Sequence, residues 1–271
     1  MIDPFQADWL KQLAKWLAAM PKESNMFLLV DGAFMPGLFR SRELDAVGAG
    51  PVALLFEALP GCSEATRDVS PFLVPLERVS RSLVLRLEQC SGWPMVSAIE
   101  TTESLPELYA RLAAWCIVEA DDHRFNFRFP DTRRLSRIFD TLTPQQRAQF
   151  TGPAIRWSYI GRAGGWEHLQ VDGKDSDVVS EPQLDNAQFR ALVEDSEPDE
   201  VLVQLAYRGF EPVGVPSIYH AQTCMALRIA DAAKLDQPMR VDWCEYVLKH
   251  ETALSESDAK LCLPRWCAGQ V

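Results

Sequence analysis

The segment from Phe125 to Trp157, FNFRFPDTRRLSRIFDTLTPQQRAQFTGPAIRW, constrains the fold of this chain more than any other stretch. Its first five residues alternate Phe with Asn or Arg, which is typical of a strand with one apolar face. Asp131 is placed to cap a helix over 132–141, and Thr143-Pro-Gln-Gln146 forms a capping box with Pro at the first helical position. The segment therefore predicts a strand, two capped helices and, after Gly152-Pro153, another strand.

The rest of the first half mixes strand and helix patterns. Short apolar runs between Gly or Pro residues predict further strands at 26–30, 52–56, 95–99 and, as a hairpin, at 154–160 and 166–171. Ser70-Pro-Phe-Leu-Val-Pro-Leu76 contains two prolines, and Pro cannot donate to a sheet ladder. We therefore expect this stretch to be an extended edge or connector. Helices are predicted at about 5–20, at about 76–90 and after the capping box Ser104-Leu-Pro-Glu107.

The second half is helical in its apolar spacing. After a polar stretch over 171–186, Phe189 and Leu192 lie on one predicted helix, and Pro198 is placed at the start of the next. Further helices are predicted over about 218–232 and 240–250. The predicted fold class is α+β: an N-terminal mixed α/β lobe over 1–172, followed by an all-helical C-terminal lobe over 173–271.

The charge of the chain is negative and unevenly spread. The 271 residues carry a net charge of −11, which argues against a sequence-independent nucleic-acid binder because phosphate neutralisation needs a basic surface. Residues 1–172 hold 18 basic against 21 acidic residues, whereas residues 173–271 hold 9 against 17. The second lobe is thus the acidic one, and a partner that docks there is expected to be basic.

Neither a membrane span nor a signal peptide is expected. No stretch reaches the roughly 18 continuous apolar residues that a span needs. The N-terminal helix has Asp8, Lys11 and Lys15 among its apolar residues, unlike the apolar core of a signal peptide. We therefore expect the chain to stay in the cytoplasm.

The reactive residue types form no recognisable catalytic or metal-binding pattern. The seven cysteines are odd in number and include no CxxC pair, so buried reduced thiols are the main interpretation. Cys262 and Cys267 leave open a small disulfide loop or a metal site. The four histidines are far apart in the sequence, without the HExxH spacing of zinc sites. We expect no catalytic residue, no cofactor and no metal.

One group of arginines forms a local excess of positive charge. It consists of Arg124, Arg128, Arg133, Arg134 and Arg137. Arg133 and Arg137 are four residues apart on the predicted helix and share a face. The group is either a site for an anion or an acidic partner, or a surface helix whose arginines pair with Asp121, Asp122, Asp131 and Asp140.

The order of several motifs resembles the cytoplasmic adaptor-chaperone family of bacterial type VI secretion, long catalogued as a domain of unknown function. The motifs that carry this resemblance span roughly residues 26–160. They are Phe27-Leu-Leu-Val-Asp-Gly-Ala33 with Pro36 and Leu38, Leu55-Phe-Glu57, Ser70-Pro-Phe-Leu-Val-Pro-Leu76, Phe127-Arg-Phe-Pro-Asp-Thr-Arg-Arg-Leu135, Leu142-Thr-Pro-Gln-Gln146 and Phe150-Thr-Gly-Pro153. Two positions depart from the family pattern. Arg111-Leu-Ala113 stands where the family often has His-Leu-Arg, and Pro130-Asp131 replaces the common Asp-Pro.

The resemblance implies a non-catalytic chaperone that binds a secreted effector and assists its loading onto the VgrG spike. The partners implied are the cognate effector and the VgrG protein, with no nucleic acid and no membrane. No catalytic residue carries over. The candidate partner-binding residues are aromatic residues of the acidic lobe and arginines of the first lobe: Tyr219, Trp243, Tyr246, Arg128, Arg133 and Arg137. For each aromatic residue, packing in the core is the competing interpretation.

Two other functions remain open. The chain could be an enzyme with an unrecognised site between the lobes, where the arginines bind an anionic substrate; this reading predicts a deep pocket with convergent titratable groups. It could also be a structural baseplate component, which predicts stable, stoichiometric incorporation.

Overall fold

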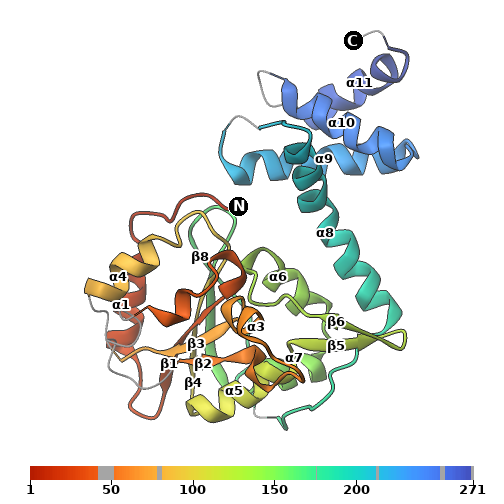
Figure 1. Ribbon diagram of the computed structural model, residues 1–271. Helices are drawn as coiled ribbons and strands as arrows, with labels where there is room; N and C mark the ends of the chain where they lie inside the picture. The colour runs from red at the N-terminus through yellow and green to blue at the C-terminus, as the bar shows by residue number, and fades with distance from the viewer. Residues whose placement is uncertain (42–51, 78–80, 175, 212–213, 251–253, 270–271) are drawn as a thin grey trace. The chain divides into compact units, whose positions relative to one another are not determined.

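The computed structural model of the chain describes residues 1–41, 52–77, 81–174, 176–211, 214–250 and 254–269 (Figure 1). It divides into two compact units, Met1–Leu192 and Val193–Val271. All described strands belong to the first unit, and the regular elements described in the second are helices. The predicted α+β class, with a mixed N-terminal part followed by a helical C-terminal part, is therefore confirmed.

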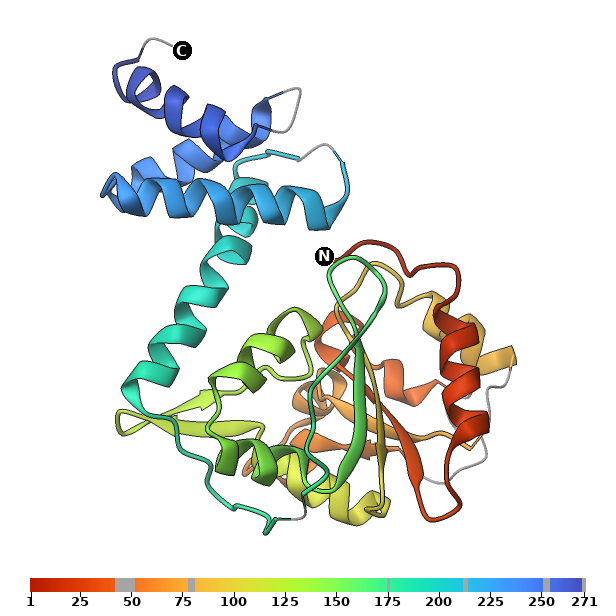
Figure 2. The same cartoon turned by 180° about the vertical axis from the view of Figure 1, so that it is seen from behind.

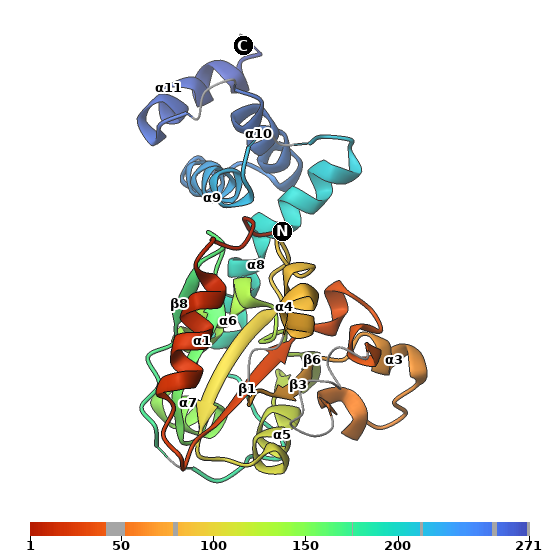
Figure 3. The ribbon, with the colours of Figure 1, turned by 90° about the vertical axis from the view of Figure 1, so that its left-hand side faces the viewer.

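A six-stranded sheet forms the centre of the first unit. Its strand order is β2-β3-β1-β4-β7-β8, and every neighbouring pair is antiparallel. β1 and β4 lie side by side in Figure 3. The strands are β1 (Asn25–Val30), β2 (Ala53–Leu54), β3 (Phe72–Pro75), β4 (Val96–Thr101), β7 (Ala154–Ile160) and β8 (Trp166–His168).

Both faces of this sheet are buried, as the unbroken apolar run of β1 requires. Phe27 and Leu29 pack on one face in a core with α5, α6 and α7, whereas Leu28 and Val30 pack on the other with α1 and α4. Figures 1 and 2 show these two helical layers from opposite sides. The helices and 3₁₀ turns are α1 (Trp9–Ala19), η1 (Gly32–Phe34), η2 (Leu38–Arg40), η3 (Leu55–Ala58), α3 (Glu64–Asp68), α4 (Arg81–Glu88), α5 (Leu105–Ala114), α6 (Thr132–Thr141) and α7 (Pro144–Thr151).

The proline-rich stretch 70–76 differs from its prediction. Its strand β3 lies between β2 and β1, so it is an interior strand and not an edge or connector. The prolines do not interrupt the ladder, because Pro71 precedes the strand and Pro75 is its last residue. The carbonyl of Pro71 accepts from Leu55 N–H at 2.8 Å, and Leu76 N–H donates to Met26 at 2.8 Å.

The segment 125–157 mostly follows its prediction. The Asp131 side chain accepts from the N–H of Arg133 at the start of α6, and Thr143 and Gln146 form the capping box of α7. The capping box of α5 at Ser104 is also present. The strand at the beginning is shorter than predicted: β6 spans His123–Asn126 and pairs with β5 (Ile117–Ala120) in a separate two-stranded sheet. Phe127 N–H still donates to Cys116, but a tight turn from Phe127 to Phe129 then ends the strand.

The second unit has its own apolar core. The helices that build it are the C-terminal part of α8 (Asn186–Tyr207), α9 (Pro216–Ala232), α10 (Gln237–Lys249) and α11 (Glu256–Cys267). The prediction that Pro198 opens a helix is wrong, because Pro198 lies inside α8. Burial of Val201 and Leu205 in the following turns holds the helix past the missing proline N–H. Helix α11 was not predicted. It buries Ala259 and Leu263, and two buried positions make a weak apolar pattern in the sequence.

The bounds of the two units differ from the predicted domains 1–172 and 173–271. Residues 173–192 belong to the first unit because several of their side chains pack there. Leu184 is part of its core, and Gln188 Nε2 donates to the Thr141 carbonyl at 2.9 Å. The rings of Phe189 and Phe125 lie with their centroids 4.4 Å apart. The polar composition of 171–186 concealed these contacts.

Candidate functional site

Four of the sequence motifs, far apart along the chain, line one pocket of the first unit. This pocket, here named the Asp31 pocket, has a volume of about 260 Å³. Its lining comes from the residues after β1 including η1, from η3, from the approach to β3, from the turn after α5, and from the last residue of β6 with the segment that follows it. The lining residues are Asp31, Ala33, Phe56, Val69, Pro71, Cys116, Asn126, Phe127, Arg128 and Pro130.

An ion pair between Asp31 and Arg128 forms one wall of this pocket. Arg128 Nη2 lies 2.9 Å from Asp31 Oδ2, and Asp31 Oδ1 accepts from Ala33 N–H at 3.0 Å. The Asp31 side chain is 2% exposed, whereas that of Arg128 is 43% exposed. Gly32 allows this corner to form, because a Cβ there would lie 2.3 Å from the carbonyl oxygen of Ser70.

The environment of Asp31 disfavours its charge. Burial raises the pKa of this carboxyl above its usual value; the Arg128 guanidinium and the Ala33 N–H act in the opposite direction, while the nearby Asp131 adds to the increase. Burial, with a smaller effect of Asp31, also raises the pKa of the Cys116 thiol. Cys116 is therefore a protonated thiol and not an activated nucleophile. These groups make the pocket an apolar recess with a polar wall.

The arginine group predicted from the sequence is only partly brought together. Arg133 makes two contacts with Asp131, at 3.0 and 2.7 Å. The guanidinium carbons of Arg128 and Arg133 lie 5.8 and 5.6 Å from the centre of the Phe34 ring. Arg124 and Arg137 are exposed. The pairing of Arg133 with Asp131 was among the predicted ion pairs, but that of Arg128 with Asp31 was not, although an Asp directly after a buried strand was visible.

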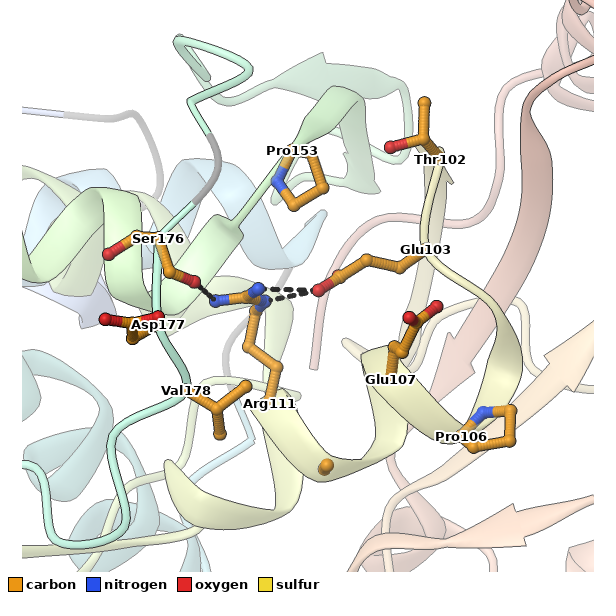
Figure 4. Close-up of a pocket in the computed structure, with 10 residues that line it drawn as sticks. Thr102, Glu103, Pro106, Glu107, Arg111, Pro153, Ser176, Asp177 and Val178 are labelled. Atoms are coloured by element: carbon orange, nitrogen blue, oxygen red, sulfur yellow. Dashed lines mark hydrogen bonds and ion pairs between the residues drawn. The ribbon is translucent and has the colours of Figure 1, made fainter.

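A second cavity of the first unit has a volume of about 510 Å³ and surrounds the side chain of Arg111. Nε and Nη2 of Arg111 donate to Glu103 Oε1 at 2.8 and 2.6 Å. Nη1 donates to the carbonyls of Gln149 and Ser176 at 3.0 and 2.9 Å. Figure 4 shows the guanidinium between Glu103 and Ser176. The cavity is lined by Thr102, Glu103, Pro106, Glu107, Ala110, Arg111, Pro153, Ser176, Asp177 and Val178.

The Arg111 contacts connect three parts of the fold. Both side chains of the ion pair are nearly inaccessible, at 3% for Arg111 and 9% for Glu103. Gly152 has φ +52°, and a Cβ there would lie 2.4 Å from Arg111 Nε. Arg111 therefore joins α5, the end of α7 and the segment at residue 176. The burial of Arg111 could have been predicted from the sequence, since Arg111 lies between Leu108 and Leu112 on the buried face of its helix.

The three aromatic candidates of the helical unit have different environments. Trp243 is fully buried and donates its indole N–H to the Ala226 carbonyl at 3.1 Å. It therefore cannot be an exposed residue that anchors a partner. Tyr246 is partly buried and stacks on Trp243, with centroids 5.5 Å apart. Tyr219 is also partly buried, at the start of α9. The core-packing interpretation therefore holds for Trp243.

Two apolar side chains that the sequence analysis did not select are exposed on the same face of α8. Val203 is 54% and Tyr207 is 89% exposed, and residues four apart are neighbours on a helix. Their spacing was readable from the sequence. However, Leu202, directly before Val203, and Leu205, between Val203 and Tyr207, gave an equally good apolar pattern. Burial alone distinguishes the two faces.

The described residues contain no group of three or more His, Cys, Asp or Glu that could hold a metal ion. All seven cysteines are free, and Cys262 and Cys267 lie on α11 without a disulfide between them. Among the helices in the described ranges, none is long and apolar enough to cross a membrane.

Comparison with known proteins gives one match. Neither a curated protein nor a solved structure matches the chain. Residues 26–149, just under half of the chain, match the model of a family described as a domain of unknown function, DUF4123. The matched region includes every residue that lines the Asp31 pocket, together with the Arg111–Glu103 ion pair.

Proposed function

We propose that this chain is a non-catalytic chaperone and adaptor that binds a type VI secretion effector in the cytoplasm and assists its loading onto the VgrG spike. The observation that carries the proposal is the motif order between residues 26 and 160, which resembles such adaptors and overlaps the matched region 26–149. The convergence of four of those motifs on the Asp31 pocket supports a shared binding role for them.

The environment of the arginines favours this carrier role over the alternative of an enzyme that acts on an anionic substrate. Arg128 and Arg133 are engaged with buried Asp31 and Asp131, and Arg137 is exposed on α6. Each guanidinium group already has a buried carboxylate partner, so the two arginines do not form the unneutralised cluster that an anionic substrate would need.

In the helical unit, the proposed contact surface is the exposed pair Val203 and Tyr207 on α8, with Tyr219 and Tyr246 as further candidates. Tyrosine provides a large contact area at a small cost in conformational entropy, and such residues often dominate binding energy. Trp243 is not part of this surface, because it is buried.

The proposal is tested by co-purification from cells that also express the proteins encoded beside this chain. We expect the tagged chain to retain a toxin-like protein and a VgrG-type protein. The double variant Val203→Ser, Tyr207→Ser should lose the effector, whereas Leu261→Ser, at another residue with an exposed apolar side chain, should retain it. The proposal fails if neither protein is retained by the unaltered chain.

A further inference from the structure

The outer edge of β6 presents backbone groups that need a partner strand. In β5, Glu119 N–H donates to Pro182 at 2.9 Å, and its carbonyl accepts from Leu184 at 2.8 Å, so both point away from β6. Arg124 stands opposite Glu119 in the ladder. Opposed residues of an antiparallel pair direct their backbone groups either toward or away from each other together. The N–H and C=O of Arg124, and those of Asn126 two residues on, therefore point outward.

Nothing in the described part of the chain bonds these four groups. β6 is the last strand of its two-stranded sheet, and no other described strand pairs with it. The side chains of Arg124 and Asn126 are exposed. An exposed row of unpaired N–H and C=O groups is a template for an added strand.

The Asp31 pocket lies at the end of this edge. Asn126 contributes both to the edge and to the pocket lining, and Phe127 and Arg128 continue from it. At about 260 Å³ the pocket is smaller than the roughly 300–1,000 Å³ of typical small-molecule sites, which suits one large apolar side chain. Edge pairing with a side-chain pocket beside it is a recurring way to recognise an extended peptide.

The charge around the pocket indicates which peptide fits. Arg128 is 43% exposed, and its closest contacts with Asp31 and Asp131, at 2.9 and 4.0 Å, are both made by Nη2. Near the opposite side, the acidic residues Glu57, Glu64 and Asp68 form ion pairs with Arg67 and Arg40. Arg124 shares a small hollow with Glu119 and Glu181. The charged residues that line the pocket are Asp31, which is buried, and Arg128, which is exposed, so the accessible charge beside the pocket is that of Arg128. A carboxylate next to the apolar side chain would complement it.

We infer that the edge of β6 and the Asp31 pocket form one docking site for an extended acidic peptide of a protein partner. The peptide adds a strand to β6, places a large apolar side chain in the pocket and directs a carboxylate to Arg128. A second copy of the chain fits less well, because it would bring its own Arg124 and Arg128 to the same ladder. The inference depends on the proposed function in one respect, which is the identity of the protein that supplies the peptide.

The test is a selection of displayed random peptides of about twelve residues on the purified full chain. We expect enrichment of peptides with a large apolar residue beside Asp or Glu. Asn126→Pro removes one outward N–H and leaves the ladder to β5 intact, because proline is tolerated where the N–H of an edge strand faces solvent. It should weaken the selected peptides at least about tenfold more than Asn126→Ala does, because the alanine variant keeps the N–H and loses only the side chain that lines the pocket.

Two further variants examine the pocket. Ala33→Leu fills the pocket from an exposed position and should also weaken binding about tenfold, while Ala187→Leu, at an exposed alanine of α8, should not. Arg128→Gln should remove the preference for Asp and Glu. Circular dichroism and thermal melting confirm that each variant is folded.

Three results would overturn the inference: no enrichment, equal binding to Asn126→Pro, or a dimer of the chain that Asn126→Pro dissociates. Each is independent of co-purification. Loss of the docking site thus leaves the proposed function standing, and failed co-purification with intact peptide binding removes only the proposed function.

Discussion

The first unit holds two arginine–carboxylate pairs that have similar chemistry and opposite surroundings. Arg111 and Glu103 are both buried, and the guanidinium also bonds two backbone carbonyls. Arg128 pairs with buried Asp31 but is itself 43% exposed beside an apolar pocket. The comparison teaches that a buried carboxylate alone does not mark a binding site. What matters is whether its partner is fully enclosed or retains donors for another molecule.

The largest effect should come from Arg111→Ala. It leaves the Glu103 carboxylate buried without its counter-charge, which lowers the free energy of unfolding by about 3–5 kcal/mol. Urea unfolding of the full chain, followed by tryptophan fluorescence, measures this loss. The exposed Arg137→Ala should change the same quantity by no more than about 0.5 kcal/mol. A loss below about 1 kcal/mol for Arg111→Ala would mean that the pair does not hold the fold together.

Gly152→Ala should lower stability by about 1–3 kcal/mol, because it combines a positive φ with a clash against the Arg111 guanidinium. Gly209→Ala is the matched control: its φ is +79°, but no atom lies within 4 Å of the added Cβ. The excess loss at residue 152 in urea unfolding measures the clash. It should shrink in a chain that already carries Arg111→Ala, since neighbouring mutations are not additive. Equal losses at 152 and 209 would assign the whole effect to the backbone.

Arg128→Ala should lower the free energy of unfolding by a smaller amount, about 1–2 kcal/mol near neutral pH. Asp31 keeps its hydrogen bond from Ala33 N–H and can take up a proton. Below the folded-state pKa of Asp31 the carboxyl is neutral and needs no counter-charge. The difference between variant and parent should therefore shrink as the pH falls. Unfolding free energies at several pH values provide the measurement. A loss independent of pH would show that Arg128 acts through packing on Phe34.

The smallest effect is a change of pH dependence in Asp31→Asn. The folded pKa of Asp31 is raised, so the folded state holds a proton that the unfolded state has already released. Stability from this group is present below the unfolded pKa and is lost as the pH rises through the folded pKa. Asp31→Asn should lack this loss of stability with rising pH. Urea unfolding between about pH 3 and about pH 7 measures the slope. Asp121→Asn, in the exposed turn before β6, controls for the lost charge. If the stability of Asp31→Asn changed with pH in the same way as that of the unaltered chain, the raised pKa of Asp31 would be contradicted.

Much of the fold could be predicted because its signals are local. The capping boxes at Ser104 and Thr143, the Asp131 cap and the hairpin of β7 and β8 each depend on residues a few positions apart. Errors arose where distant contacts override local preference. β3 is interior despite Pro71 and Pro75, and α8 continues through Pro198.

The candidate sites show the same limit. The sequence identified Arg128 as part of a basic group and Tyr246 as an aromatic candidate. It could not indicate that Trp243 is enclosed by its own unit. Whether a side chain is buried depends on what packs over it, and the covering residues come from other elements.

The sequence by itself determined the α+β class, the positions of the caps and the order of motifs on which the proposed function rests, because each follows from neighbouring residues. Only the tertiary structure decided that Asp31 meets Arg128, that Arg111 is enclosed, and that the edge of β6 leads into a pocket. Those features bring together residues nearly a hundred positions apart, such as Asp31 and Arg128. Their contact depends on how the sheet, its two helical layers and the β5–β6 hairpin pack together. No local pattern of residues encodes a contact between such distant positions.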